Sequence, residues 1–247
     1  MRLRHCLAAL CILAAGILHA EDIQVAVAAN FAAPMQVIAR NFEAETGHRL
    51  HLAFGATGKF YAQIANGAPF DVLLAADDET PARLVREGLA RSGSQTPYAV
   101  GRLILWSPRP DRVDGSGDIL RRGDFARLAL ANPKTAPYGA AAIEAMTSLG
   151  LLPALQGKFV LGENIAQAYQ FVASGNADLG FIALSQVWAN GQLTQGSGWI
   201  VPADLHQPIR QDAVVLTRTA VPAAASALLA YLKGDRARAV IKTYGYQ

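Results

Sequence analysis

The feature that most limits the fold of this chain is a repeated alternation of short apolar runs with segments of helical spacing. The run at 23–29 is rich in Val, Ile and Ala, which is typical of a strand buried on both faces of a parallel sheet. A helix-like segment follows, with Pro34 in its first turn and Gly47 after its end. Strands that alternate with helices form parallel sheets covered on both faces. The pattern therefore predicts an α/β fold.

The same order of strand and helix continues to the end of the chain. Further strands are predicted at 50–54, 70–76, 99–106, 128–132, 158–162, 177–184 and 213–217. Helices are predicted at 60–65, 81–88, 139–149, 164–174, 222–233 and 235–244. The stretch 109–123 is rich in Pro, Gly, Asp and Arg and is predicted to be a surface loop.

The composition supplies the core that such a fold needs. Of the 247 residues, 52% are hydrophobic and 17% are charged, which excludes a disordered chain. The formal charge is only +3 and no run of Lys and Arg occurs, so we expect no nucleic-acid partner. Beyond residue 20 the chain has no stretch of about 20 uninterrupted apolar residues, so we expect no membrane insertion of the mature protein.

The N-terminus has the pattern of an export signal. Two arginines precede the apolar run 6–18, and the small residue Ala20 precedes two acidic residues. We predict that residues 1–20 are a secretory signal peptide, with an uncleaved membrane anchor as the alternative. Cys6 and Cys11 both lie within this segment, so the mature chain is expected to have neither disulfide nor thiolate chemistry.

Four predicted helix starts share a composition suited to holding an anion. They are small-residue, Gly or capping segments that follow a strand or short loop, at 30–34, 55–59, 137–140 and 163–166. The first N–H groups of a helix lack internal partners, and the aligned peptide dipoles add partial positive charge there. In an open α/β sheet these ends gather outside the carboxyl ends of the strands. Several of them meeting at one point would bind an anion without Lys or Arg.

Side chains at these helix starts offer further donors. The hydroxyls of Thr57 and Tyr138 can donate to an anion, although a helix cap and a packed turn residue are the ordinary structural alternatives. Lys59 follows a glycine, but the surrounding residues do not match Gly-x4-Gly-Lys-Ser/Thr, which disfavours a nucleotide loop.

Short motifs along the chain stand in a recognisable order. They are Ala-Asn-Phe at 29–31, Gly-Ala-Thr-Gly-Lys-Phe-Tyr-Ala-Gln-Ile at 55–64, Asn-Gly-Ala-Pro at 66–69, Ala-Ala-Asp at 75–77, Ala-Pro-Tyr-Gly at 136–139, Ala-Asp-Leu-Gly-Phe at 177–181, Tyr-Leu-Lys-Gly at 231–234 and Tyr-Gly-Tyr at 244–246. Together, and over essentially the whole mature chain, they resemble the periplasmic molybdate-binding proteins of ABC transporters.

This resemblance implies a type II periplasmic-binding-protein fold, with mainly parallel sheets flanked by helices and a ligand cleft between two lobes. We expect the first lobe to comprise 21–101 plus 212–247 and the second lobe 102–211. The strands near Gly101 and Gln211 link the two halves and are the expected hinges.

The resemblance also implies the ligand and its contacts. An oxyanion would be bound by Ala29, Asn30, Thr57, Tyr138 and Ile165, of which Ala29 and Ile165 can offer only backbone N–H groups. The chain departs from the family at Ala29, where a hydroxyl residue is frequent, and at Thr57, where Ser is usual. Another branch has a Tyr near Ala183, which here cannot donate.

The implied function is capture of molybdate, and of tungstate, by a monomeric periplasmic protein that delivers the anion to an import permease. We expect no catalytic residue, no cofactor and no direct protein ligand to a metal. The alternatives are another oxyanion, such as sulfate or phosphate, and a periplasmic hydrolase. His48 and His51 lack a nearby carboxylate partner, and Glu163 is the single acid among the four helix starts, so the hydrolase has little support.

Overall fold

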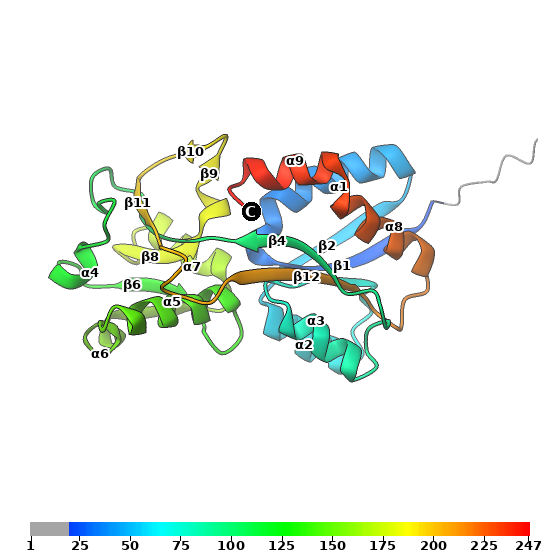
Figure 1. Ribbon diagram of the computed structural model, residues 1–247, viewed down its shortest axis with the longest axis horizontal. Helices are drawn as coiled ribbons and strands as arrows, with labels where there is room; N and C mark the ends of the chain where they lie inside the picture. Colours follow the sequence, from blue (N-terminus) through cyan, green and yellow to red (C-terminus); the bar gives the residue numbers. More distant parts are fainter. Residues whose placement is uncertain (1–19) are drawn as a thin grey trace, which may run out of the picture.

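The chain folds into two five-stranded sheets that lie side by side, each with helices on both faces (Figure 1). The computed structural model describes residues 20–247, so the predicted signal peptide lies outside the described residues apart from Ala20. The first sheet has the order β2-β1-β3-β12-β4 and the second β11-β5-β8-β6-β7. The predicted α/β class is confirmed.

The strands of the two sheets come from different parts of the chain. The first sheet contains β1 (Asp22–Ala28), β2 (Arg49–Gly55), β3 (Val72–Leu74), β4 (Thr96–Gly101) and β12 (Ile209–Val215). The second contains β5 (Leu103–Ser107), β6 (Leu128–Ala131), β7 (Phe159–Gly162), β8 (Leu179–Ala183) and β11 (Ser197–Ile200). A small hairpin is formed by β9 (Trp188–Ala189) and β10 (Gln192–Leu193).

One strand in each sheet runs against the other four. In the first sheet β12 is antiparallel to both of its neighbours, whereas β1, β2 and β3 are parallel. In the second sheet β5 is antiparallel to β8 and β11, whereas β6, β7 and β8 are parallel. The reversed strands are those by which the chain enters each sheet directly from the other. The sheets are therefore mainly parallel, as predicted.

The single strand predicted at 99–106 is wrong, because β4 and β5 belong to different sheets and Arg102 separates them. Apolar residues continue on both sides of Gly101, so periodicity alone could not mark the change of sheet. The return crossing comes before Ile209, and Gln211 lies inside β12 next to a bulge. The exact lobe boundaries, like the hinges, stay predictions.

Helices cover the first sheet on two sides. Val25 and Val27 of β1 face three helices on one side: α1 (Ala32–Thr46), α8 (Pro222–Lys233) and α9 (Asp235–Thr243). Ala26 faces two helices on the other side: α2 (Thr57–Ala65) and α3 (Glu79–Arg86). The helix α1 ends before Gly47, whose φ of 75° is strained for other residues. The predicted burial of β1 on both faces is confirmed.

The second sheet is covered in the same way. One face packs against α4 (Ile119–Arg122), α5 (Pro137–Ser148) and α6 (Leu152–Leu155), and the other against α7 (Ile165–Ala173). Short 3-10 turns complete the chain at η1 (Ala29–Phe31), η2 (Gln156–Lys158) and η3 (Leu184–Gln186). The predicted surface loop 109–123 is wrong in part, because the adjacent apolar residues at 119 and 120 are buried in α4.

Among residues 20–247 no single helix is long and apolar enough to cross a membrane. One bent pair, Pro137–Ser148 with Leu152–Lys158, has the length and composition of a span, and its Ala142, Met146 and Leu155 lie in the core against the second sheet.

Gly180 gives a test of this packing. A Cβ at this position would lie 2.7 Å from Val172 Cγ2 and 2.8 Å from the Ala129 carbonyl oxygen, so the strand and α7 would have to separate. We expect Gly180→Ala to cost about 1–3 kcal/mol and to lower the thermal midpoint by about 2–12 °C. The control is Gly157→Ala, where a Cβ meets no atom within 4 Å. Equal midpoints for the two variants would contradict this account.

Candidate ligand-binding site

The four predicted helix starts meet at one cavity between the two sheets. Its lining consists of small, aliphatic and neutral polar residues: Ala28, Ala29, Asn30, Gly55, Ala56, Thr57, Ala76, Ala136, Pro137, Tyr138, Asn164 and Ile165. The turn η1 follows β1, α2 follows β2, α5 follows β6 and α7 follows β7. Because the carboxyl ends of parallel strands lie at one edge of each sheet, the helix starts converge there.

All five residues predicted to bind a ligand line this cavity. They are Ala29, Asn30 and Thr57 from the first sheet's side and Tyr138 and Ile165 from the second sheet's side. Each is between 1% and 6% exposed. The cavity has a volume of about 10 Å³, which is room for about one water-sized sphere and far less than the roughly 300 Å³ or more of pockets for drug-sized ligands. The space suits a small ion.

Thr57 is set up as a hydroxyl donor. Its Oγ1 accepts a hydrogen bond from the backbone N–H of Ala76 at 2.9 Å. This bond fixes the oxygen and leaves the hydroxyl hydrogen for another acceptor. Thr57 also begins α2, so its donor lies beside the positive end of that helix.

At the start of α7, the capping residue accepts from two backbone N–H groups and leaves a third one free of it. The Asn164 Oδ1 accepts from the N–H groups of Ala166 at 2.9 Å and Gln167 at 3.1 Å. These bonds leave the N–H of Ile165, which lies at the first helical position and lines the cavity. The cap therefore explains why an aliphatic residue suits this place, because its backbone is the donor.

The side chain of Asn30 does not present its N–H groups to the cavity. Its Nδ2 donates to Gln211 Oε1 at 2.9 Å and to the hydroxyl of Tyr246 at 3.0 Å. Both amide hydrogens are therefore engaged behind the site. What Asn30 offers to a ligand is its backbone N–H, next to that of Ala29 at the beginning of η1.

Tyr138 is a neutral donor. Its hydroxyl oxygen accepts from Gln211 Nε2 at 3.1 Å, so this bond leaves the phenolic hydrogen for an acceptor elsewhere. Burial, with a smaller effect from the neighbouring Tyr246, raises the pKa of Tyr138 well above its usual value of 10. The group therefore keeps its hydrogen throughout the physiological range.

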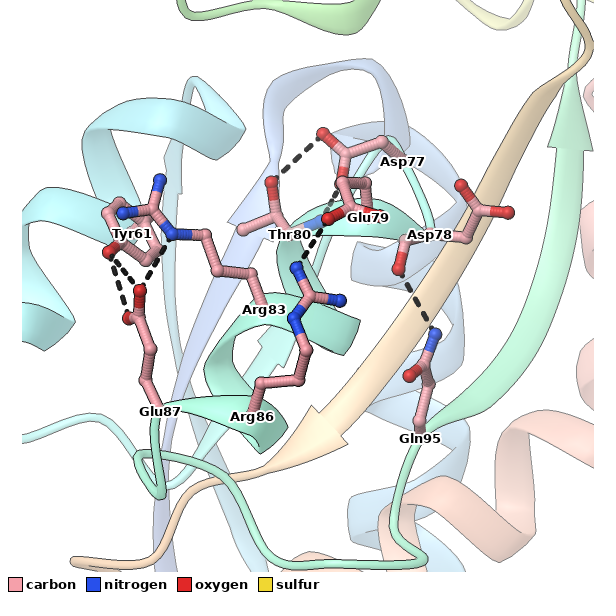
Figure 2. Close-up of polar contacts among 9 residues, drawn as sticks. All are labelled: Tyr61, Asp77, Asp78, Glu79, Thr80, Arg83, Arg86, Glu87 and Gln95. Atoms are coloured by element: carbon pink, nitrogen blue, oxygen red, sulfur yellow. Dashed lines mark hydrogen bonds and ion pairs between the residues drawn. The ribbon is translucent and has the colours of Figure 1, made fainter.

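No carboxylate, ammonium, guanidinium or imidazole group lines the cavity within the described part of the chain. Asp77 follows the lining residue Ala76, but its carboxylate accepts from Thr80 N at 2.8 Å and Thr80 Oγ1 at 3.1 Å, and burial raises its pKa (Figure 2). Glu163 instead pairs with Lys59 at 3.2 Å on the surface. The cavity thus presents neutral donors at the positive ends of helices.

Comparison with known proteins agrees with this arrangement. A family model described as bacterial extracellular solute-binding protein matches residues 23–247. The chain belongs to this family. It is 59% identical over 227 residues to the molybdate-binding protein ModA of Azotobacter vinelandii, with 92% of this chain and 90% of the relative covered. It is 50% identical to the molybdate-binding protein ModA of Rhodobacter capsulatus, with 92% and 88% covered.

A solved structure is also similar to this solute-binding protein. The Azotobacter vinelandii periplasmic molybdate-binding protein superposes with a TM-score of 0.89 at 40% identity, over 91% of this chain and 98% of that one. The family resemblance and the fold that it implied are confirmed.

Among the described residues of this solute-binding protein, His48, His51 and His206 do not line the cavity. His48 Nδ1 accepts from the backbone N–H of Glu21 at 3.2 Å. His51 Nε2 lies 3.4 Å from Asp22 Oδ1 at the surface, so the expectation that both histidines lack a carboxylate partner is wrong for His51. Nowhere in residues 20–247 do three or more His, Cys, Asp or Glu side chains come together to hold a metal ion. Ala183, which replaces the Tyr of another branch, is buried and does not line the cavity.

The sequence did not indicate the residues behind the cavity. Gln211, Tyr246 and Ser185 all lie within hydrogen-bonding distance of Asn30. Gln211 was predicted only as a hinge residue, and Tyr246 was noted only as part of the Tyr-Gly-Tyr motif at 244–246. That motif, placed at the end of the chain, was the one available signal.

The buried tyrosines predict how stability depends on pH. Burial raises the pKa of Tyr246 to about 12 and those of Tyr98 and Tyr138 well above 10. Between pH 10 and 12 the unfolded chain loses protons that the folded protein keeps, so stability is complete below pH 10 and falls as the pH rises. We expect the free energy of unfolding to fall by about 1.4 kcal/mol per pH unit for each such tyrosine.

Urea unfolding one pH unit below and one pH unit above pH 10 measures this fall in the free energy of unfolding. Tyr246→Phe is the control, and its free energy of unfolding should fall less. Phenolate absorbance gives a second check. If all seven tyrosines ionised near pH 10 in the folded protein, the predicted pKa increases would be wrong.

Proposed function

We propose that this solute-binding protein captures molybdate, and tungstate as well, in the periplasm and delivers it to the membrane permease of an ABC importer. The observation that carries the proposal is the small cavity between the two sheets, where four helix starts present neutral donors and, among the described residues, no charged side chain. The relatives named as molybdate-binding proteins support the same ligand. In this proposal the ligand-binding residues are Ala29, Asn30, Thr57, Tyr138 and Ile165.

The donor set favours a fully deprotonated dianion. Backbone N–H groups and the hydroxyls of Thr57 and Tyr138 all donate, so each oxygen of the ligand must accept. Phosphate at neutral pH carries a proton and needs an acceptor. The two carboxylates next to lining residues in the chain, Asp77 after Ala76 and Glu163 before Asn164, are bonded to Thr80 and Lys59 instead. A protonated anion would therefore bury an unsatisfied hydrogen or force two donors together.

Size separates the remaining dianions. Sulfate has shorter bonds than molybdate, so its oxygens would not reach donors on both sides of the cavity at once. The donors are fixed on helix starts and cannot all move inward without unpacking the helices. Tungstate is nearly the same size as molybdate and should bind in the same way.

Capture by closure explains why the donors come from both sides. Contacts already join the two halves around the cavity: Gly58 N donates to the Thr135 carbonyl at 2.9 Å, and Lys59 pairs with Glu163. An anion that bridges both sets of helix starts would stabilise this closed arrangement, and opening would release it. The lobes at 21–101 plus 212–247 and 102–211 would turn about the strands near Gly101 and Gln211.

The remaining parts of the proposal concern the form of the protein. The signal peptide at 1–20 would direct export, and the mature protein would act as a monomer without membrane insertion. We expect no catalysis, in keeping with relatives that are named as molybdate-binding proteins.

The first test is thermal melting of the mature protein with excess molybdate, tungstate, sulfate or phosphate. Ligand at a thousand times its dissociation constant adds about 4 kcal/mol, which for a chain of this size is a midpoint rise of about 8–16 °C. We expect that rise with molybdate and tungstate only. A larger rise with sulfate or phosphate would mean that the site binds an oxyanion but that molybdate is not its ligand. No rise with any of the four anions would overturn the proposal.

Thr57 provides a residue-level test. Removing a hydrogen bond to a charged group costs about 1.5–3 kcal/mol, so Thr57→Ala should weaken molybdate binding by about ten- to a hundredfold. Thr57→Ser keeps the hydroxyl and should bind within about threefold of the parent, which separates the donor from the shape of the side chain. Titration calorimetry measures both. Binding by Thr57→Ala as tight as the parent's would show that the site is misplaced.

A further inference from the structure

Behind the cavity lies a connected set of buried polar side chains that are not themselves among the proposed donors to the ligand. Its members beyond the cavity-lining residues are Tyr98, Ser185, Gln211 and Tyr246, all less than 10% exposed. We call these four residues the rear network. They come from the first sheet, from η3 after the second sheet, and from the C-terminus.

The rear network holds Asn30 from two directions. The side-chain amide donates to Gln211 Oε1 and to the Tyr246 hydroxyl. The backbone carbonyl oxygen accepts from Tyr246 Oη at 2.8 Å and from Ser185 Oγ at 2.8 Å. With both its side chain and its carbonyl fixed, residue 30 has little freedom to turn its backbone N–H away from the cavity.

Gln211 links Asn30 to Tyr138 across the two halves. Its Oε1 accepts from Asn30, and its Nε2 donates to the Tyr138 hydroxyl at 3.1 Å. If the Gln211 amide were turned over, its NH2 group would face the NH2 group of Asn30, and two donors would meet. The hydrogen-bond pattern therefore identifies which atom of the Gln211 amide is the oxygen and which is the nitrogen. Gly101 makes room for this link, because a Cβ there would lie 2.1 Å from the Tyr138 hydroxyl.

Tyr246 is held in place by the end of the chain. The backbone of Gln247 exchanges two hydrogen bonds with Val100 of β4, at 2.9 and 3.1 Å. The Tyr246 ring packs edge-on against Phe31 with 5.4 Å between centroids. Figure 1 places the C-terminus at the junction of the two halves. Tyr246 is therefore buried and fixed behind the cavity, whereas Gln247 is exposed.

We propose that Tyr246, Gln211 and Ser185 are positioning residues, which aim the donors of Asn30 and Tyr138 at the anion once the two halves have come together. The inference rests on the proposed function. Ser185 belongs to the second half and Asn30 to the first, so the hold on residue 30 is complete only in the closed arrangement. Closure and donor orientation are thereby coupled, and a partly closed protein has a poorer site.

A role in stability alone makes a different prediction. A buried hydroxyl that only supports the fold lowers the thermal midpoint when removed but leaves the ligand affinity unchanged. Thr219 provides that comparison, because its buried Oγ1 donates to Asp71 at 2.6 Å and it does not line the cavity. Thr219→Val removes this hydroxyl with little change in shape.

The experiment measures the dissociation constant for molybdate and the thermal midpoint without ligand for the parent, Tyr246→Phe, Ser185→Ala and Thr219→Val. Tyr246→Phe removes one hydroxyl and keeps the ring against Phe31. We expect Tyr246→Phe to weaken molybdate binding by about 10- to 100-fold. Ser185→Ala should weaken it by about threefold or more. Thr219→Val should bind molybdate within about twofold of the parent, although its thermal midpoint falls by a comparable amount.

The outcomes separate the two proposals. If the parent binds molybdate and both Tyr246→Phe and Ser185→Ala bind as tightly, the positioning role is overturned and the proposed function stands. The same holds if Thr219→Val weakens binding as much as Tyr246→Phe does. If the parent itself fails to bind molybdate, the proposed function falls and this inference falls with it. Should Tyr246→Phe not fold, Ser185→Ala against Thr219→Val decides the question.

Discussion

The rest of the structure depends on the unpaired N–H groups at the starts of four helices, which meet in one small cavity between the two sheets. These groups have no partner within their own helix, and burying them costs free energy unless another group accepts their hydrogens. At the cavity itself the capping residue Asn164 meets this need for two N–H groups of α7. At the cavity the remaining donors face each other from two halves of the protein. Under the proposed function one small dianion satisfies them together, so the closed arrangement and the bound ligand stabilise each other.

Neutral donors solve a problem of selectivity that charged ones would not. A Lys or Arg in the cavity would attract any anion of suitable size, protonated or not. Here the attraction comes from helix ends and from the hydroxyls of Thr57 and Tyr138, whose directions are fixed by Ala76 and Gln211. Because burial raises the pKa of Tyr138, that hydroxyl stays a donor over the whole physiological range. Under the proposed function the site would therefore discriminate by geometry and protonation state rather than by net charge.

Donors with fixed directions require a rigid support, and the structure supplies it from behind. Asn30 has the side chain of a cavity residue but uses it to reach Gln211 and Tyr246, leaving its backbone for the ligand. One residue thus has two separate roles, one for its side chain and one for its backbone. It also explains the crowding at Gly101, where any side chain would displace the Tyr138 hydroxyl and the Gln211 amide.

Local chemistry in the sequence determined the strand and helix order, the helix α8 at 222–233 and the four helix starts, because caps, prolines and apolar spacing act within a few residues. The five cavity residues came from those starts together with the family resemblance, and they do lie together. Only the tertiary structure decided that 99–106 divides between two sheets and that the Asn30 amide turns away from the cavity. Its partners Gln211 and Tyr246 lie 181 and 216 residues further along the chain. Contacts at such separations depend on how whole sheets come together, and no local pattern records them.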